Sequence, residues 1–528
     1  MENRFNLIDE PWLPIADVGR VSLRQVFTNP SYRALGGNPV QKIALMKLLL
    51  AIAQAACTPE DEDAWQALGV EGMAQRCLAY LEQWHDRFYL YGDKPFLQMP
   101  AVKALIQART ESRLKVAKTA GKKCEAEESG RPKGMGAGFY PDLPSENNTQ
   151  LSATLFDKEM GDADKAIFIT TLMNFSFAGK RVESDLINLS GEKTGNRYSG
   201  PAGPSIGGWD GQLHCFVLAP SLIESIWLNL ITFENLSQYT HWPSGLGKPI
   251  WEETPKSESD AIAKRHKETY QATLIALSRF TLLVDDGLLY LDGIQYPKVK
   301  EGWAEASLLI NYAEIKDIKV QYVNVDKKPW RSLPSLLAFN TANSSNGHEC
   351  IGLKINLSRC HGQFEKISIW CGGLKVTANS GDQSAKQEDD FVASQVDLYV
   401  DQLGGFFFTN LLEEMKLLEQ FEKNLAGCTT AYYKEQTGKS AKPPQIASSM
   451  ADRAKHHYWQ LCERDFQNLL DHCGQGAEFR AARYRLRQRF ASYVHQAYDR
   501  YCPQDTARQL DAWAQCRPKL GKYLKKED

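Results

Sequence analysis

Apolar positions recur at helical spacing through the first half of the chain. The clearest case is residues 39–56, a long and strongly apolar segment that predicts a buried helix. A short strand and turn are predicted at residues 6–15, and residues 212–218 are typical of a strand. Further helices are predicted at residues 22–27 with Ser22 as the N-cap, 61–89, 164–178 and 221–231.

Alternating and β-branched segments become dominant after about residue 280. Residues 280–284 and 288–291 flank Asp285-Asp286-Gly287, which is a good hairpin signal. A second hairpin is predicted from residues 366–377, with Cys371-Gly372-Gly373 as its turn and a polar extension through Asn379 and Gly381.

The pattern changes again after about Asp389, where helical spacing resumes without strand signals. Four helices are predicted at residues 391–426, 447–470, 478–500 and 506–523. Their lengths and short connections indicate an antiparallel four-helix bundle. The predicted fold class is therefore α+β: a large mixed α/β domain with β-hairpins at residues 1–388, then the bundle at residues 389–528.

Residues 198–211 contain five glycines and two prolines, so this segment is neither a helix nor a central strand. Its glycines never stand two positions apart, which excludes the GxGxxG nucleotide motif. Two interpretations remain open: a loop that brings bare backbone close to a ligand, and a structural corner.

Charge is balanced over the 528 residues, with a net charge of −2, so any nucleic-acid contact depends on local patches. One basic patch lies within residues 103–133. A second is a helical run of five arginines: Arg480, Arg483, Arg485, Arg487 and Arg489. The alternative for each patch is a solvated charged surface.

Several function classes are disfavoured by missing patterns. The twelve cysteines form no CxxC pair, which favours reduced, buried thiols over a zinc site. The sequence has no uninterrupted apolar run of about 18 residues and no signal-peptide pattern, so a soluble, cytoplasmic protein without a membrane partner is expected.

The catalytic motifs that the sequence suggests are also incomplete. Gly438-Lys439-Ser440 lacks the first glycine of a phosphate-binding loop, because Tyr433 stands there, and His348-Glu349 does not continue into HExxH. The chain is therefore predicted not to be an enzyme and to need no cofactor or metal.

Short motifs follow one another in a recognisable order. They are NLIDEPWLPI at 6–15 with VSL at 21–23, WHDRFYL at 84–90 with PFLQ at 95–98, LPSENN at 143–148 with TLFD at 154–157, PIWEE at 249–253, LSRF at 277–280 and Tyr458-Trp459. In this order they resemble the large subunit of the type I-E CRISPR surveillance complex Cascade, the CasA family. The resemblance covers essentially the whole chain.

The resemblance implies a non-catalytic role in antiviral defence. Such subunits find the protospacer-adjacent motif (PAM) in double-stranded DNA, help to open the duplex for guide pairing in an R-loop, and present the complex to a helicase-nuclease. Implied partners are the backbone and small Cascade subunits, the CRISPR guide RNA, double-stranded target DNA and the helicase-nuclease.

The resemblance also implies DNA-contacting positions. The glycine-rich loop that approaches the PAM from the minor groove corresponds to Gly200, Gly203, Gly207 and Gly208. The lysine finger corresponds to Lys298, with Lys300 as second choice; the alternative for each is an ordinary surface lysine.

A wedge and a docking loop complete the implied sites. The wedge corresponds to the segment after Gly373, where no glutamine occupies the tip; its candidates are Lys375, Val376, Thr377 and Asn379. The loop that docks on the guide RNA and neighbouring subunits corresponds to Asn147, Asn148, Phe156 and Asp157, although a plain connecting loop is the alternative. The arginine run at 480–489 is a candidate for DNA phosphates. A rival interpretation is a purely structural assembly subunit that binds only RNA.

Overall fold

The computed structural model of the chain describes residues 2–119, 160–176, 211–284, 287–297, 299–311, 318–337, 348–379, 382–384, 391–437 and 444–524. Two compact units make up the chain. The N-terminal unit comprises Met1–Trp330, Asn346–Cys360 and Ser368–Gln395, and the helical unit comprises Arg331–Ser345, His361–Ile367 and Val396–Asp528.

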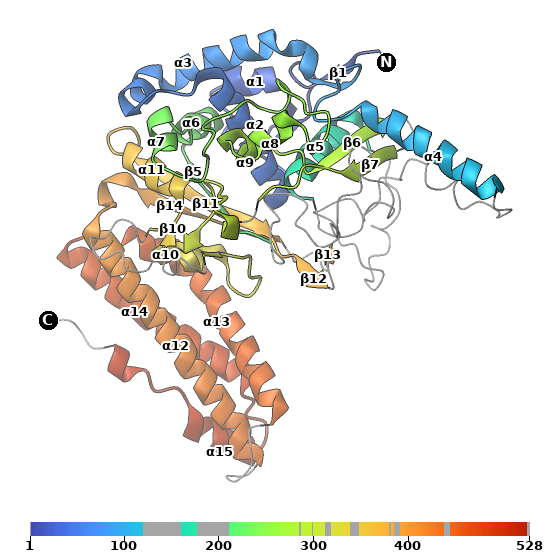
Figure 1. Ribbon diagram of the computed structural model, residues 1–528. Coiled ribbons are helices and arrows are strands. Elements are labelled where there is room, and N and C mark those ends of the chain that lie inside the picture. The colour runs from blue at the N-terminus through green and yellow to red at the C-terminus, as the bar shows by residue number, and fades with distance from the viewer. Residues whose placement is uncertain are drawn as a thin grey trace. The chain divides into compact units, whose positions relative to one another are not determined.

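Helices of the N-terminal unit surround one central member, α2 (Figure 1). The helices are α1 (Leu23–Thr28), α2 (Pro39–Cys57), α3 (Glu62–Gln83), α4 (Ala101–Thr119), α5 (Asp162–Asn174), α6 (Leu222–Leu228), α7 (Phe233–Ser237), α8 (Ala261–His266), α9 (Tyr270–Leu274) and α11 (Ile351–Arg359). Helix α2 packs against α3, α5, α6 and α9. This central position explains why its apolar residues extend around the whole helix.

The start of α2 follows from its sequence. Asn38 accepts a hydrogen bond from the Gln41 backbone N–H, and the Gln41 side chain accepts one from the Asn38 N–H, so the two residues form a capping box before Pro39. By length and composition α2 could cross a membrane, but most of it is buried inside the protein, as in the core helix of a soluble protein.

A charged residue stands in the middle of this apolar helix. Lys47 is fully buried, and its Nζ donates a hydrogen bond of 2.7 Å to Glu305 Oε2. Burial lowers the pKa of Lys47, whereas the Glu305 carboxylate opposes that shift. His214 Nδ1 lies 3.8 Å from the same Glu305 oxygen. The core therefore contains a buried polar cluster rather than a purely apolar contact.

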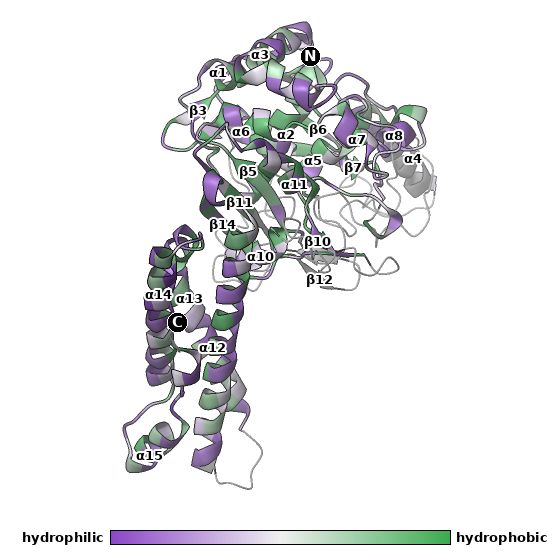
Figure 2. Cartoon of the chain, turned by 90° about the vertical axis from the view of Figure 1, so that its left-hand side faces the viewer, coloured by the Kyte–Doolittle hydropathy of each residue, from purple (hydrophilic) through white to green (hydrophobic). Residues whose placement is uncertain are grey.

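Most of the described strands form short sheets. They are β1 (Arg4–Asn6), β2 (Leu13–Ile15), β3 (Gly19–Val21), β4 (Tyr89–Tyr91), β5 (His214–Leu218), β6 (Arg279–Val284), β7 (Gly287–Asp292), β8 (Ile310–Asn311), β9 (Lys319–Val320), β10 (His348–Glu349), β11 (Lys366–Leu374), β12 (Thr377–Asn379), β13 (Asp382–Ser384) and β14 (Phe391–Tyr399). Strands β14, β11 and β5 form one sheet in that order, and β5 pairs antiparallel with β11 from Leu218↔Ser368 to His214↔Gly372. Figure 2 shows β5 and β11 as mainly hydrophobic.

Two predicted hairpins had different outcomes. The hairpin around Asp285-Asp286-Gly287 is confirmed, because β6 pairs antiparallel with β7 from Arg279↔Asp292 to Val284↔Gly287. The predicted turn at Cys371-Gly372-Gly373 is wrong, because these residues lie inside β11. The two glycines serve close packing instead: a Cβ at Gly372 would stand 2.7 Å from Trp370 Cζ2, and one at Gly373 would stand 2.6 Å from Val323 Cγ2.

Three long helices and a short one form most of the helical unit: α12 (Gly405–Thr437), α13 (Gln445–Asp471), α14 (Ala477–Tyr501) and α15 (Ala507–Cys516), with a single further turn at α10 (Leu333–Leu336). Helix α12 packs against α13, α14 and α15, and α13 packs against α14. Hydrophilic and hydrophobic residues alternate along α12 and α14 (Figure 2). The helical character predicted for the C-terminal region is confirmed.

The boundaries of this region differ from the prediction at both ends. Residues 391–399, predicted to begin a helix, form strand β14, where the buried residues Val392, Val396 and Leu398 follow the spacing of two that a strand requires. The last helix ends at Cys516 rather than at residue 523, close to Pro518, which cannot continue a helix. In the N-terminal unit, α3 likewise ends at Gln83, and residues 89–91 form β4.

Candidate nucleic-acid interface

A second hairpin, β12–β13, is separated from the end of β11 by two residues and contains two of the four wedge candidates. Its register runs from Thr377↔Ser384 to Asn379↔Asp382, which leaves two residues for the turn. Thr377 and Asn379 therefore lie in the hairpin, and Asn379 is next to the turn. Lys375 is half-buried and Val376 is fully buried. Of the four candidates, Val376 belongs to the core below the hairpin.

The end of the glycine run packs against the base of this hairpin. Gly211, the last glycine of the run, is the part of it that the structure describes. Its backbone faces the Leu374 carbonyl and Val376 so closely that a Cβ there would overlap the Leu374 oxygen and stand 3.3 Å from Val376 Cγ2. Two residues that are far apart in the sequence therefore touch backbone to backbone. This contact, together with Gly373, is the glycine junction.

Neighbouring hydrogen bonds hold the glycine junction in place. The Val323 N–H donates to the Gly211 carbonyl at 2.8 Å, and the Leu213 N–H donates to the Gln321 carbonyl at 3.0 Å. A Cβ at Gly373 would stand 2.5 Å from the Gln212 carbonyl oxygen, so bare backbone is needed on that side too. Sequence reasoning missed Gly373 as a packing residue, because it assigned the glycine pair to a turn.

Many residues predicted from the resemblance lie outside the described part of the chain. These are the PAM-loop glycines Gly200, Gly203, Gly207 and Gly208, the finger candidate Lys298, and the docking-loop residues Asn147, Asn148, Phe156 and Asp157. The Lys300 backbone lies in a short 3-10 helix, Val299–Glu301, but its side chain is not described.

The segment that precedes Lys298 is firmly anchored. Tyr296 is buried, and its hydroxyl accepts a hydrogen bond of 2.9 Å from the Leu277 N–H and lies 3.2 Å from His266 Nδ1. Gly293 packs so closely on the backbone of residues 277–279 that no Cβ fits there. The chain therefore enters the finger segment from a fixed position in the core.

The arginine run on α14 divides into structural and exposed members. Arg487 forms hydrogen bonds with both carboxylate oxygens of Glu414, at 2.7 and 3.0 Å, and Arg483 Nε lies 3.5 Å from Glu414 Oε1. Glu414 and Arg483 are buried. These two arginines are therefore committed to the core of the helical unit.

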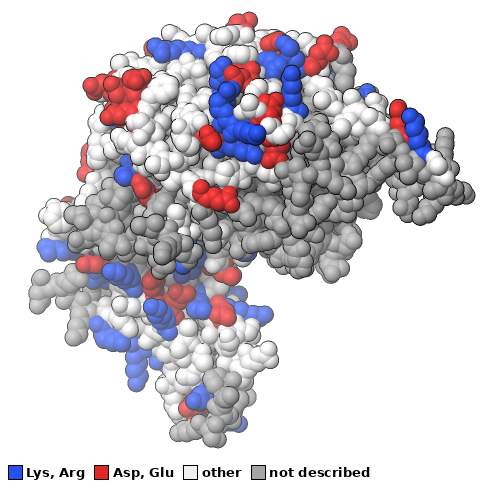
Figure 3. Space-filling view, viewed as in Figure 1, with Lys and Arg blue, Asp and Glu red and all other residues white. Residues whose placement is uncertain are grey.

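The other three arginines of the run are accessible. Arg480, Arg485 and Arg489 are exposed, and Arg489 Nη1 pairs with Asp465 Oδ1 at 2.7 Å. Figure 3 shows Lys and Arg side chains on the surface of the helices of this unit. The run therefore offers three side chains, not five, to a polyanion.

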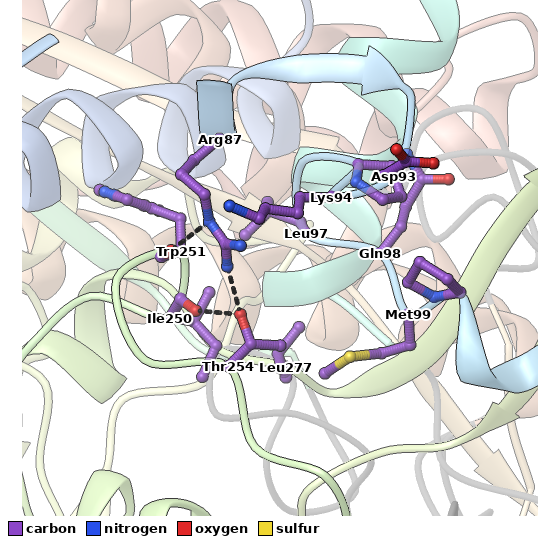
Figure 4. Close-up of a pocket in the computed structure, with 12 residues that line it drawn as sticks. Arg87, Asp93, Lys94, Leu97, Gln98, Met99, Ile250, Trp251, Thr254 and Leu277 are labelled. Atoms are coloured by element: carbon purple, nitrogen blue, oxygen red, sulfur yellow. Dashed lines mark hydrogen bonds between the residues drawn. The ribbon is translucent and has the colours of Figure 1, made fainter. Parts of the chain in front are cut away.

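Four of the family-like motifs meet at one place in the N-terminal unit. Arg87 Nε donates to the Trp251 carbonyl at 2.7 Å, and Arg87 Nη2 donates to Thr254 Oγ1 at 2.6 Å (Figure 4). The buried Gln98 side chain donates to the Leu90 carbonyl at 2.8 Å and accepts from the Leu283 N–H at 2.7 Å.

These contacts surround a cavity of about 120 Å³ whose lining includes Arg87, Gln98, Trp251, Thr254 and Leu277. The lining mixes polar and apolar residues, and the polar side chains of Arg87, Gln98 and Thr254 form hydrogen bonds within the protein. The motifs at 84–90, 95–98, 249–253 and 277–280 therefore fix the architecture around the β6–β7 hairpin. Among the described residues, no three His, Cys, Asp or Glu side chains come together as metal ligands.

Comparisons with known proteins identify the family of the chain. The family model described as CRISPR-associated protein Cse1 matches residues 6–500. A CasA/Cse1 protein of Thermus thermophilus is 35% identical over 107 residues, which make up 18% of this chain and 21% of that protein.

Solved structures extend the likeness to nearly the full length. The crystal structure of Thermobifida fusca Cse1 superposes with a TM-score of 0.71 at 19% identity and covers 99% of this chain and 98% of its own. Thermus thermophilus CasA gives a TM-score of 0.69 at 18% identity and 99% coverage of both chains. A chain of a structure described as a CRISPR RNA-guided surveillance complex gives 0.65 at 14% identity, with 97% and 98% coverage.

Proposed function

Because the chain belongs to the CRISPR-associated Cse1 family, the large-subunit family that its motifs resemble, we propose that it recognises the PAM in double-stranded target DNA. In this role it helps to open the duplex, so that the guide RNA pairs with the target strand, and it recruits the helicase-nuclease. The division of labour is that of RNA-guided systems, in which protein reads the short PAM and base pairing reads the rest. The subunit itself is non-catalytic.

The glycine junction is the observation that carries this proposal. It joins the end of the glycine run, which is proposed to read the PAM, to the base of the β12–β13 hairpin, which is proposed to separate the strands. A contact between backbone atoms transmits position directly, because no flexible side chain intervenes. Reading the PAM and inserting the hairpin are therefore proposed to occur at a fixed spacing.

The proposed DNA contacts follow from this arrangement. The minor-groove contact comes from Gly200, Gly203, Gly207 and Gly208, and Lys298 or Lys300 supplies the finger. Thr377 and Asn379 lie at the hairpin, Lys375 stands beside it, and the buried Val376 supports its base. Asn147, Asn148, Phe156 and Asp157 are proposed to dock on the guide RNA and on neighbouring subunits.

Assembly is proposed to involve the backbone and small subunits of Cascade. The chain is proposed to act in the cytoplasm as two domains, residues 1–388 and 389–528, the second an antiparallel four-helix bundle. Its phosphate contacts are proposed to come from the exposed Arg480, Arg485 and Arg489. Arg483 and Arg487 are left to the core, because Glu414 holds them.

A comparison of duplexes tests the proposal. Guide-loaded complex with this chain is mixed with target duplexes that differ only at the PAM, and binding is measured by gel shift. Omitting the chain should abolish the difference between the duplexes. If the PAM preference persists without the chain, recognition resides elsewhere and the rival, a purely structural RNA-binding subunit, is favoured.

A point variant separates recognition from assembly. Gly203→Val adds a branched side chain to the proposed minor-groove contact, and it should weaken PAM-dependent binding while the complex still assembles. Loss of assembly in this variant would instead favour the structural role.

A further inference from the structure

Two exposed arginines and a half-buried histidine form a second line on α13, next to the arginine run of α14. Arg453, His457 and Arg464 stand four and seven residues apart, so they share one side of α13. On α14, Arg485, Arg489, Gln496 and Arg500 follow the same spacing. All four arginines at positions 453, 464, 485 and 500 are exposed.

Contacts between the helices bring the two lines together. Arg489 Nη1 binds Asp465 Oδ1 at 2.7 Å, and the Tyr493 hydroxyl donates to the other Asp465 oxygen. His457 stands eight residues before Asp465 on α13, and Tyr501 stands eight residues after Tyr493 on α14. The centroids of the His457 and Tyr501 rings lie 6.1 Å apart. The helices therefore run antiparallel, and their cationic lines lie side by side. We refer to Arg453, Arg464, Arg485, Arg489 and Arg500 as the α13–α14 cationic face, in which the ring of His457 lies between Arg453 and Arg464.

Nearby carboxylates leave most of this charge uncompensated. Among the described residues, Arg453, Arg464, Arg485 and Arg500 form no ion pair. Asp465 is occupied by Arg489 and Tyr493, and Asp499 is occupied by Arg517 at 2.8 Å.

Asp471 stands seven residues after Arg464 and so ends the cationic line of α13, where it accepts a hydrogen bond of 2.8 Å from Gln467. The other two acids of α13 stand on another line of the helix. Asp452 and Glu463 share that line with His456, and Asp452 pairs with Lys455. Burial, together with the charges of Arg500, Arg464 and His456, lowers the pKa of His457. Glu478, seven residues before Arg485, ends the line of α14 in the same way as Asp471 ends that of α13. Beyond these end acids, the four arginines without an ion pair give the cationic face an excess of positive charge.

We propose that the α13–α14 cationic face binds the phosphate backbone of single-stranded DNA. The line on α13 is about 16 Å long and that on α14 about 22 Å, at 1.5 Å per helical residue. The rings of His457 and Tyr501 and the amides of Gln460 and Gln496 lie among the arginines. Cations interleaved with aromatic rings are typical of surfaces that hold single strands without reading their sequence.

This inference rests on the proposed function, because an opened duplex supplies the unpaired strand that needs such a surface. It extends the DNA contact from the arginine run to a second helix. It also assigns the contact to phosphates, so the strength of binding should depend on salt and not on base sequence.

The test uses the full chain and a fluorescent oligothymidylate of about 20 nucleotides, a length that spans one or more typical single-strand sites. Anisotropy is measured over a series of salt concentrations. For Arg464→Gln/Arg500→Gln, the slope of log K against log salt should become shallower by about 1.4, because each lost contact removes about 0.7. At about 0.1 M salt this corresponds to about 25-fold weaker binding, about 5-fold for each arginine.

A matched control removes the same charge elsewhere. Lys416 and Lys423 are exposed on α12. Lys416→Gln/Lys423→Gln should leave both slope and affinity close to those of the unchanged chain. If both double variants weaken binding equally, the effect is net charge alone and the cationic face is not a site.

Two further outcomes would overturn the inference. If a duplex of equal length loses as much affinity as the single strand, the face binds duplex DNA. If the single strand does not bind and Arg464→Gln/Arg500→Gln fails to join the guide-loaded complex, the face docks a protein subunit. Failure of the proposed function looks different: the PAM preference of the guide-loaded complex then persists when this chain is omitted, while binding of the oligothymidylate by the chain is untouched.

Discussion

Gly373→Ala tests whether the glycine junction positions the β12–β13 hairpin. An added Cβ would stand 2.5 Å from the Gln212 carbonyl oxygen and 2.6 Å from Val323 Cγ2, whereas ordinary contacts begin at 3.4 Å. The backbone on one side must therefore move by about 0.9 Å (3.4 − 2.5). The opposing atoms belong to backbone and to a short branched side chain, so neither can simply rotate away.

The expected cost follows from the effect of overpacking. Extra methyl groups in a well-packed core cost about 1–3 kcal/mol in the free energy of unfolding. Because the hairpin leaves the sheet only a few residues after Gly373, the same displacement shifts it relative to Gly211. If the open DNA complex requires the native spacing, the equilibrium for base opening should fall by about 5- to 150-fold, which is the factor equivalent to 1–3 kcal/mol.

Fluorescence of a 2-aminopurine next to the PAM measures base opening in the guide-loaded complex, and urea unfolding of the same protein measures its stability. Gly427→Ala is the control, because a Cβ at that position in α12 meets nothing within 4 Å. This control should leave opening unchanged. If Gly373→Ala lowers stability as expected but opens DNA as well as the unchanged protein, the junction does not position the hairpin and the reasoning fails.

Two further predictions concern stability, one for each unit. Glu414→Gln should lower the free energy of unfolding of the helical unit by about 3–5 kcal/mol, because Arg483 and Arg487 then lose their carboxylate. Urea unfolding measures this against Glu413→Gln, an exposed neighbour, and equal effects of the two variants would contradict it. In the N-terminal unit, burial lowers the pKa of His266 to about 4. The unfolded chain binds that proton near pH 6.5, so stability falls as the pH drops from about 6.5 to about 4, at most by about 1.4 kcal/mol per unit from this group. His266→Gln should flatten the fall of Tm over this window, and an unchanged slope would count against the assignment.

Local signals in the sequence were sufficient where neighbouring residues decide the structure. Ser22 caps α1, Asn38 and Pro39 start α2, and Asp285-Asp286 connects β6 to β7, all within a few residues of the elements that they define. The order of the family-like motifs was likewise readable, because it needs no knowledge of contacts.

Long-range contacts decided the features that sequence reasoning missed. Gly372 and Gly373 look like a turn, yet they lie in β11 because Trp370, Gln212 and Val323 leave no room for a side chain. The arginine run looks uniform, but Glu414, more than sixty residues earlier, binds Arg483 and Arg487, and Arg483 also donates to the carbonyls of His472 and Gly474. The sequence of β14 does contain apolar residues at the even spacing of a strand, but the helical pattern that follows it led to the prediction of a helix there.

Lys47 has a consequence before the protein is folded. Even with it, α2 is long and apolar enough by composition to cross a lipid bilayer. A lysine near the centre of such a segment makes the free energy of insertion into the bilayer less favourable by about 2.5–3.5 kcal/mol. We therefore expect the ammonium that Glu305 neutralises in the finished core also to disfavour insertion of the emerging helix into a bilayer. Lys47→Leu would remove this barrier and would leave the buried Glu305 carboxylate without its hydrogen-bonded lysine.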